Sequence, residues 1–332
     1  MKKIRVLLCG TVFGQIYLRG VLKNEAYEIK GILSKGSEKS KEIANTYGLK
    51  LHTDIDEIKS EDYDLALVVV RSGIIGGKGN TIALSLINKG ISVIQEQPVH
   101  ADEAAQLFKA AVKNNVYYSV NTFYPSLKTS RVFHKKINEL KEKEEIKSID
   151  GSCSIPVLLP FIDQVCRIAR GVHPYVIDDN KILQTSRKTV MVIKICGIEC
   201  TLSINGTLKK ADIEDSAYLL NSMNVMFKSG NLMLTEVNGQ VVFIPRPYIV
   251  EEYLKQGKAD EKQDKIATEL LCDYSGKRFT ELYANEWPEA VCNYLSEKEE
   301  KIRAKKCDIS EMQYYMGLCE LWKDISDRIG RK

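Results

Sequence analysis

The chain has 332 residues, of which 44% are hydrophobic and 28% are charged, so it is long enough to form two globular domains. Its 48 basic and 44 acidic residues leave a net charge of only +4, which argues against a nucleic-acid-binding or membrane-surface protein. Nine cysteines without a CxxC pair indicate reduced thiols and no metal site. The first apolar run predicts a strand rather than a signal peptide, and no window is long and apolar enough to span a membrane. We therefore expect a cytoplasmic protein.

In the first part of the chain, short apolar runs alternate with amphipathic helical segments, a pattern typical of βαβ units around a parallel sheet. The expected strands are Ile4–Leu8, Glu28–Leu33, Leu65–Val70, Ile91–Gln95 and Val116–Val120. Asn80 is expected to cap one of the intervening helices, and Gly90 to end it. The pattern predicts an α/β Rossmann domain with a doubly wound parallel sheet over residues 1–124.

After Pro125 the pattern changes to a charged helix (about 127–145), followed by longer strand-like stretches. These stretches are 188–205, 217–227 and 231–245. Residues 255–265 are charged and predict an exposed loop, and a capping box at Asp308 predicts a last helix at about 308–330. We expect residues 125–332 to form a mixed α/β domain with a largely antiparallel sheet for substrate binding and dimerisation, and the last helix to pack back on the first domain.

The turn after the first strand predicts a dinucleotide site. It contains Gly10, Thr11, Val12, Phe13 and Gly14, at the place where a Rossmann turn brings backbone amides and a helix N-terminus to a pyrophosphate. The full GxGxxG pattern is absent because Val12 and Gln15 replace two of its glycines, so an ordinary strand-to-helix turn stays open as an alternative.

The end of the second strand indicates which nicotinamide cofactor is preferred. Ser34 stands where a free ribose 2′-hydroxyl usually meets an Asp or Glu. Ser37 and Lys39 follow and suit a 2′-phosphate, which predicts NADP(H) rather than NAD(H). The alternative is that these lysines are the solvated start of a helix.

Other candidate cofactor-binding residues follow later strands, because ligands of open parallel sheets bind at the carboxyl ends of the strands. Arg71 and Ser72 follow the third expected strand, Glu96 and Gln97 the fourth, and Asn121 the fifth. We expect Glu96 to brace the turn into Pro98, Gln97 to donate a hydrogen bond to the nicotinamide amide or the substrate, and Asn121 to orient Tyr124 or the cofactor.

Glu96-Gln97-Pro98 resembles the Glu-Lys-Pro signature of the Gfo/Idh/MocA oxidoreductase family. In that family the lysine assists proton transfer during sugar oxidation, so the resemblance implies an NAD(P)-dependent enzyme. Gln97 cannot titrate, and this departure argues against an ordinary sugar dehydrogenase.

A narrower resemblance is to the thiazolinyl imine reductases of siderophore biosynthesis, a branch of the same family. It rests on CGTVFGQIYL, GILSKGSEKSKEIANTYG, VVVRSGIIGGKG, VIQEQPVHADE, NTFYP and QYYMGLCELWKDI. The resemblance implies NADPH-dependent reduction of a thiazoline C=N to a thiazolidine, on an intermediate tethered to a carrier protein of a nonribosomal peptide synthetase. The family also suggests a homodimer through the sheet of the second domain.

In that branch the position of Gln97 is commonly a histidine, so Tyr124, which matches the tyrosine of the family's NTFYP run, becomes the expected proton donor. An ordinary tyrosine is protonated at neutral pH, as an acid must be. A packed aromatic is the alternative role for Tyr124. Residues 158–163 and the region near His173 are expected to touch the substrate. Asp163 is a disfavoured substitute for the acid, because an aspartate of ordinary pKa is ionised at neutral pH.

Two other functions stay open. The first is another reductase or dehydrogenase of the same family that acts on a free small molecule. The second is a catalytically silent NADP-binding regulatory protein, which would also explain the loss of a titratable group at Gln97.

Overall fold

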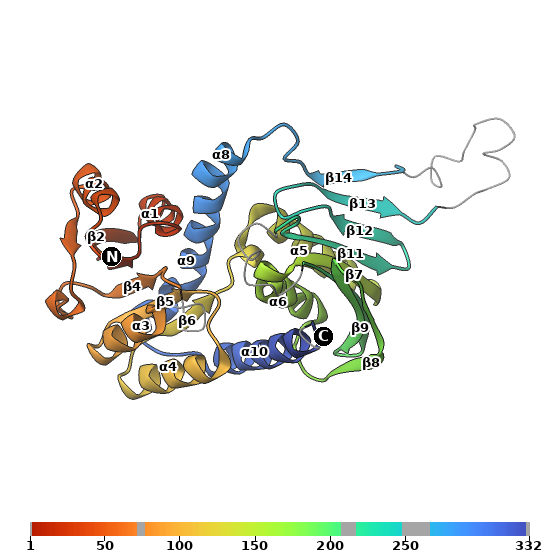
Figure 1. Cartoon of the computed structure of the whole chain (residues 1–332). Coiled ribbons are helices and arrows are strands. Elements are labelled where there is room, and N and C mark those ends of the chain that lie inside the picture. The colour runs from red at the N-terminus through yellow and green to blue at the C-terminus, as the bar shows by residue number, and fades with distance from the viewer. Residues whose placement is uncertain (1, 72–76, 207–216, 248–265, 330–332) are drawn as a thin grey trace, which may run out of the picture. The chain divides into compact units, whose positions relative to one another are not determined.

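The computed structural model describes residues 2–71, 77–206, 217–247 and 266–329, which divide into two compact units (Figure 1). Unit 1 consists of residues 1–127 and 278–320, and unit 2 of residues 128–277 and 321–332. The chain first passes from unit 1 to unit 2 between residues 127 and 128, near the expected domain boundary after residue 124. Residues 278–307, which we expected in the second domain, belong to unit 1.

Unit 1 is built on a six-stranded parallel sheet with the order β3-β2-β1-β4-β5-β6. The strands are β1 (Ile4–Cys9), β2 (Tyr27–Leu33), β3 (Lys50–His52), β4 (Leu65–Val68), β5 (Ser92–Glu96) and β6 (Tyr118–Asn121). The order reverses between β1 and β4, which creates the switch point where such sheets bind ligands. The predicted Rossmann fold is therefore confirmed, with β3 as an additional strand.

The helices of unit 1 cover both faces of this sheet, with α1 (Gly14–Leu22) and α2 (Glu38–Tyr47) on one side and α3 (Gly79–Asn88) and α4 (Ala101–Lys113) on the other (Figure 1). One helix start differs from the expectation. Asn80 is the second residue of α3, not its cap, because Lys78 holds the cap position. The Asn80 side chain instead accepts a hydrogen bond of 2.6 Å from the buried Gln95 amide.

Residues from the end of the chain complete unit 1. α8 (Phe279–Glu281) and a π-helical turn, η5 (Leu282–Glu286), lead into α9 (Trp287–Ala304), which packs along α1. The contact is close because α1 has Gly20 there: a Cβ on Gly20 would lie 2.6 Å from Cβ of Val291 and 2.8 Å from the Pro288 carbonyl oxygen. The first half of α10 (Ile309–Ile329) also belongs to unit 1, where the Tyr315 hydroxyl donates to the Val99 carbonyl.

Unit 2 is built on an eight-stranded sheet with the order β14-β13-β12-β11-β7-β10-β9-β8. The strands are β7 (Ile146–Ser154), β8 (Tyr175–Gln184), β9 (Lys188–Ile195), β10 (Ile198–Asn205), β11 (Asn221–Phe227), β12 (Gly230–Leu234), β13 (Val241–Pro245) and β14 (Glu269–Cys272). All neighbours are antiparallel except β7 and β10, so the expected mixed, largely antiparallel sheet is confirmed.

Two helices of unit 2, α5 (Lys128–Lys141) and α6 (Leu158–Ala169), lie against this sheet. The end of α10 belongs to the same unit, since the Tyr175 hydroxyl donates to Asp324 and the Arg328 guanidinium pairs with Asp179. The expected loop at 255–265 falls outside the described residues.

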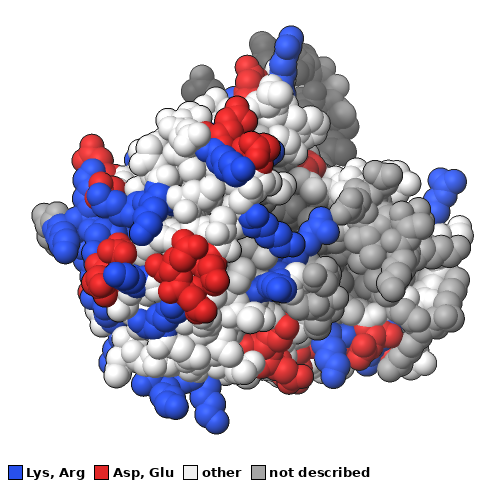
Figure 2. Space-filling view, turned by 60° about the vertical axis from the view of Figure 1, so that its left-hand side comes forward, with Lys and Arg blue, Asp and Glu red and all other residues white. Residues whose placement is uncertain are grey.

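In the described ranges no helix is both long and apolar enough to cross a membrane. The face of the molecule in Figure 2 carries Lys and Arg side chains interspersed with Asp and Glu side chains, in keeping with the small net charge of the sequence.

Candidate active site

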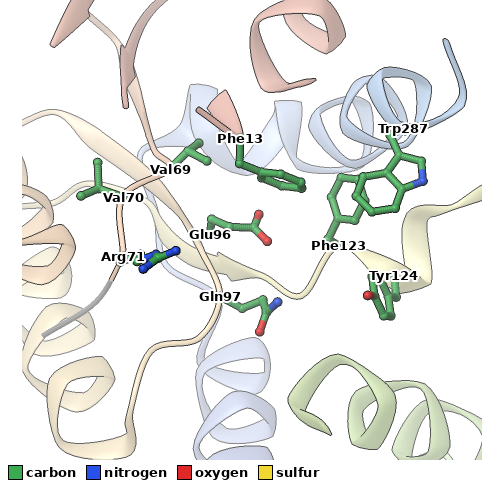
Figure 3. Close-up of a pocket in the computed structure, with 9 residues that line it drawn as sticks. All are labelled: Phe13, Val69, Val70, Arg71, Glu96, Gln97, Phe123, Tyr124 and Trp287. Atoms are coloured by element: carbon green, nitrogen blue, oxygen red, sulfur yellow. The ribbon is translucent and has the colours of Figure 1, made fainter. Parts of the chain in front are cut away.

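A pocket of about 290 Å³ lies at the carboxyl ends of β4, β5 and β6, within unit 1 (Figure 3). Its lining residues are Phe13, Val69, Val70, Arg71, Glu96, Gln97, Phe123, Tyr124 and Trp287. The pocket adjoins the switch point of the sheet, where the Rossmann topology places a dinucleotide.

The turn from β1 to α1 lies in close backbone contact with the residues that follow β4. Gly10 has a φ of +95°, and a Cβ at this position would lie 2.4 Å from the Val69 carbonyl oxygen, so only glycine fits. No side chain caps α1, and in its first turn the N–H groups of Gln15 and Ile16 donate to the carbonyls of Val12 and Phe13. The positive end of the helix dipole still favours an anion at this turn. Val12, at the tip of the turn, is 80% exposed. The turn therefore fits the pyrophosphate of a dinucleotide, although two glycines of the usual pattern are missing.

Hydroxyl groups from the β1–α1 turn and from α2 gather beyond the end of β2. The Ser37 hydroxyl caps α2 by accepting from the Ser40 N–H, and it lies 2.9 Å from the Ser40 hydroxyl. The Ser40 hydroxyl in turn lies 3.1 Å from that of Thr11. Ser34 accepts from the Gly36 N–H, and the Lys39 side chain is exposed in the first turn of α2. Ser37 thus has a structural role as a helix cap, within a cluster of hydroxyl groups that also includes Ser40 and Thr11.

Glu96 is held by a hydrogen-bonded chain that starts at the backbone. The Phe123 N–H donates to Oδ1 of Asn121 (2.9 Å), the Asn121 amide donates to the Tyr17 hydroxyl (2.7 Å), and this hydroxyl donates to Oε2 of Glu96. Burial outweighs the hydrogen bond from Tyr17 and raises the pKa of Glu96 to about 8. Burial and the nearby Glu96 also raise the pKa of Tyr17 well above its ordinary value. At neutral pH the pocket therefore contains a neutral carboxylic acid.

A strained turn directs Tyr124 into the pocket. Phe123 has a φ of +68° and a ψ of −56°, and the Tyr124 N–H donates to the Thr122 carbonyl (2.8 Å), which makes a γ-turn centred on a non-glycine residue. Tyr124 is only 5% exposed. In Figure 3 its hydroxyl faces the side of the pocket on which Gln97 lies. The turn therefore places the Tyr124 phenol in the pocket that the Gln97 amide also lines.

Three aromatic side chains form one wall of the pocket. Phe13, Phe123 and Trp287 meet pairwise with ring centroids 5.0 to 5.9 Å apart. Trp287 is the first residue of α9, and sequence reasoning missed it because no local pattern connects it to the Rossmann segment. Its neighbour Pro288 suggests a helix start, but the packing of α9 on α1 depends on Gly20.

The structure brings most of the predicted site residues into unit 1 around this pocket. Phe13, Arg71, Glu96, Gln97 and Tyr124 line it, and Asn121 lies behind it in the chain to Glu96. The turn residues and the Ser34, Ser37 and Lys39 group lie around the starts of α1 and α2. Ser72 falls outside the described residues.

The expected substrate contacts of the second domain lie in unit 2. Residues 158–163 form the first half of α6 and are buried. The fully buried Asp163 pairs with Arg167 at 3.0 Å, so it serves as an ion-pair partner within unit 2.

Residues 4–122 match the model of the Gfo/Idh/MocA family, described as an oxidoreductase family with an NAD-binding Rossmann fold. No curated protein sequence matches the chain.

Solved structures match over nearly the whole chain. A dehydrogenase (MviM) from Clostridium difficile is 15% identical, with a TM-score of 0.69, over 98% of this chain and 99% of that one. The 3-ketoreductase KijD10 from Actinomadura kijaniata, in complex with NADP and TDP-benzene, is 13% identical (TM-score 0.71, 98% of both chains). An oxidoreductase from Agrobacterium radiobacter in complex with NAD+, L-tartaric acid and magnesium is 8% identical (TM-score 0.71, 99% of this chain and 97% of that one). At these identities the likeness shows a shared two-domain fold.

Proposed function

Because residues 4–122 match the model of the Gfo/Idh/MocA oxidoreductase family with its NAD-binding Rossmann fold, we propose that this chain is an NADPH-dependent reductase. The pocket at the carboxyl ends of β4 to β6 is the observation that carries the proposal, since it combines a phenol, a carboxyl and an amide beside the dinucleotide turn. The dinucleotide supplies a hydride when bound.

Each group of residues has a task in this proposal. The uncapped N-terminus of α1 binds the pyrophosphate, while Ser34, Ser37 and Lys39 bind the 2′-phosphate. Gln97 donates a hydrogen bond to the substrate or to the carboxamide of the cofactor. Tyr124 donates the proton that a reduced double bond needs on its heteroatom.

We further propose that the substrate is a thiazoline ring on a carrier protein of a peptide synthetase, whose C=N bond is reduced to a thiazolidine. Gln97 supports this choice because it cannot act as the base that alcohol oxidation requires. The aromatic wall of Phe13, Phe123 and Trp287 supports it as well, because it suits a flat heterocycle.

The experiment is to mix the protein with NADPH and a thiazoline-bearing carrier protein, and to follow the loss of reduced cofactor and the mass of the product. A free thiazoline thioester is tested in parallel with ketones and, with NADP+, with polyols. Oxidation of NADPH with a mass gain of two hydrogens on the carrier is the expected result. Turnover of ketones or polyols alone would favour a dehydrogenase or reductase of free small molecules. Cofactor binding without any turnover would favour a silent regulatory protein.

A further inference from the structure

Glu96 is an acid in the pocket whose proton has no role in the proposed reaction. Its carboxyl group points towards the rings of Phe13 and Phe123 in Figure 3. Among the described residues it accepts a hydrogen bond from Tyr17 and forms no ion pair. A carboxylate in this position would be a partly desolvated charge, which is costly.

The hydrogen-bonded chain behind Glu96 fixes which oxygen can carry the proton. A backbone N–H can only donate, so the N–H of Phe123 sets Oδ1 of Asn121 as the acceptor. The Asn121 amide then donates to the Tyr17 hydroxyl, and this hydroxyl directs its own hydrogen to Oε2 of Glu96. Oε2 is thereby an acceptor, and the proton of the neutral acid belongs on Oε1.

The dinucleotide that the pocket is proposed to bind changes its charge during the reaction. Its nicotinamide ring is neutral when reduced and carries a positive charge when oxidised. A positive ring in the pocket would stabilise a carboxylate at Glu96, and a neutral ring would not.

We propose that Glu96 is a redox-linked proton site, protonated while reduced nicotinamide occupies the pocket and ionised while oxidised nicotinamide does. This inference rests on the proposed cofactor function. In the reductive direction, the O–H bond at Oε1 breaks as the ring becomes cationic, and the proton passes to solvent. Glu96 regains a proton when the oxidised cofactor leaves, so each turnover still consumes one hydride and one proton overall.

The other titratable groups on the elements around Glu96 are Tyr17, Tyr124, Arg71 and His100, and the Glu96→Gln variant separates their charge changes from that of Glu96. Burial raises the pKa of Tyr17 on α1 well above its ordinary value, so its hydroxyl stays protonated between pH 6 and pH 9. His100 follows β5, and burial lowers its pKa.

The test is the pH dependence of cofactor affinity, measured by calorimetry for NADP+, NADPH, NAD+ and NADH from pH 6 to pH 9. We expect the affinity for the oxidised cofactor to rise about tenfold or more with pH, because a pKa difference of one unit corresponds to tenfold. The affinity for the reduced cofactor should change much less. Mixing with oxidised cofactor at pH 7 in weak buffer should release up to one proton per site, detected with an indicator dye.

Three variants make the assignment specific. Glu96→Gln keeps an acceptor for Tyr17, and it should abolish both the proton release and the difference in pH dependence. Tyr17→Phe removes a hydrogen bond that lowers the pKa of Glu96, so the midpoint for oxidised cofactor should move to higher pH. Glu300→Gln makes the same chemical change at an exposed position of α9 and should behave as wild type.

Equal pH dependence for oxidised and reduced cofactor in wild type, or undiminished proton release in Glu96→Gln, would overturn the proposal while leaving the cofactor function intact. Failure of all four cofactors to bind at any pH would overturn both.

Discussion

At the scale of single residues, the position of Tyr124 could be predicted from the sequence, whereas the raised pKa of Glu96 could not. Tyr124 follows β6 and could be placed near the pocket from the strand pattern alone. The raised pKa of Glu96 could not be predicted, because it depends on burial and on Tyr17, which is 79 positions away in the chain. The γ-turn at Phe123 has no sequence signal either, since residues other than glycine rarely adopt positive φ.

Tyr124→Phe tests the proton donor and keeps the ring that packs in the pocket. If the hydroxyl supplies the proton, kcat should fall by about 100-fold or more, because general acid catalysis contributes at least this much. NADPH affinity should change little. The measurement is steady-state turnover together with the NADPH dissociation constant. Turnover within a few-fold of wild type would mean that another group supplies the proton.

Glu96→Gln should change how stability depends on pH. The pKa of Glu96 is raised from 4.5 in the unfolded chain to about 8 in the folded one, so the folded state holds an extra proton between these values. The free energy of unfolding of the wild type must therefore fall as pH rises through this window, by at most roughly 1.4 kcal/mol for each pH unit. Glu96→Gln has no titratable group at this position, so its free energy of unfolding should not show this fall.

Urea unfolding at pH 5 and pH 8 measures the effect. We expect the stability of Glu96→Gln relative to wild type to increase by about 2 to 4 kcal/mol from pH 5 to pH 8. Glu300→Gln is the control and should show no such change. A constant difference between Glu96→Gln and wild type would contradict a raised pKa.

At the scale of elements, the pocket depends on the contact between α1 and α9. This contact brings Trp287 to the same pocket as Phe13, and it requires that residue 20 have no side chain. No helix was expected over residues 287–304, and hydrophobic periodicity says nothing about which other element a helix packs against. This is why residues 278–307 were expected in the other domain.

Gly20→Ala should force α9 away from α1. The new methyl group would lie within 3 Å of Val291 and of the Pro288 carbonyl, and overpacking of this kind costs about 1 to 3 kcal/mol despite the better helix propensity of alanine. Thermal unfolding reports the loss of stability, and the emission of Trp287, measured with Trp322→Phe in both chains, reports the displacement of α9. A variant that is more stable than wild type would show that the close contact between the helices is absent.

Lys39→Ala tests the start of α2 as a phosphate site without removing the Ser37 cap. We expect NADPH affinity to fall roughly threefold to tenfold, since one charged hydrogen bond to the 2′-phosphate is lost, while NADH affinity stays unchanged. Lys109→Ala, at an exposed position of α4, should change neither the NADPH affinity nor the NADH affinity. An equal effect of Lys39→Ala on both cofactors would support the alternative of a solvated helix start.

At the scale of the whole molecule, the order of strands and helices was largely predictable and the composition of the units was not. The aliphatic runs that became β1, β2, β4, β5 and β6 are buried in the sheet, which is the local signal that hydrophobic patterning provides. The assignment of α9 and of half of α10 to unit 1 depends on contacts between segments far apart in sequence, such as Tyr315 with Val99. Patterning carries no information about such contacts.

The most direct test of the central claim is whether a nicotinamide cofactor binds in the pocket that Trp287 lines. The chain has two tryptophans, so Trp322→Phe leaves Trp287 as the only indole. Titration of this variant with NADPH should quench Trp287 emission to saturation and produce sensitised emission from the reduced nicotinamide. Emission that is unchanged over the whole range of NADPH and NADH concentrations would contradict the account.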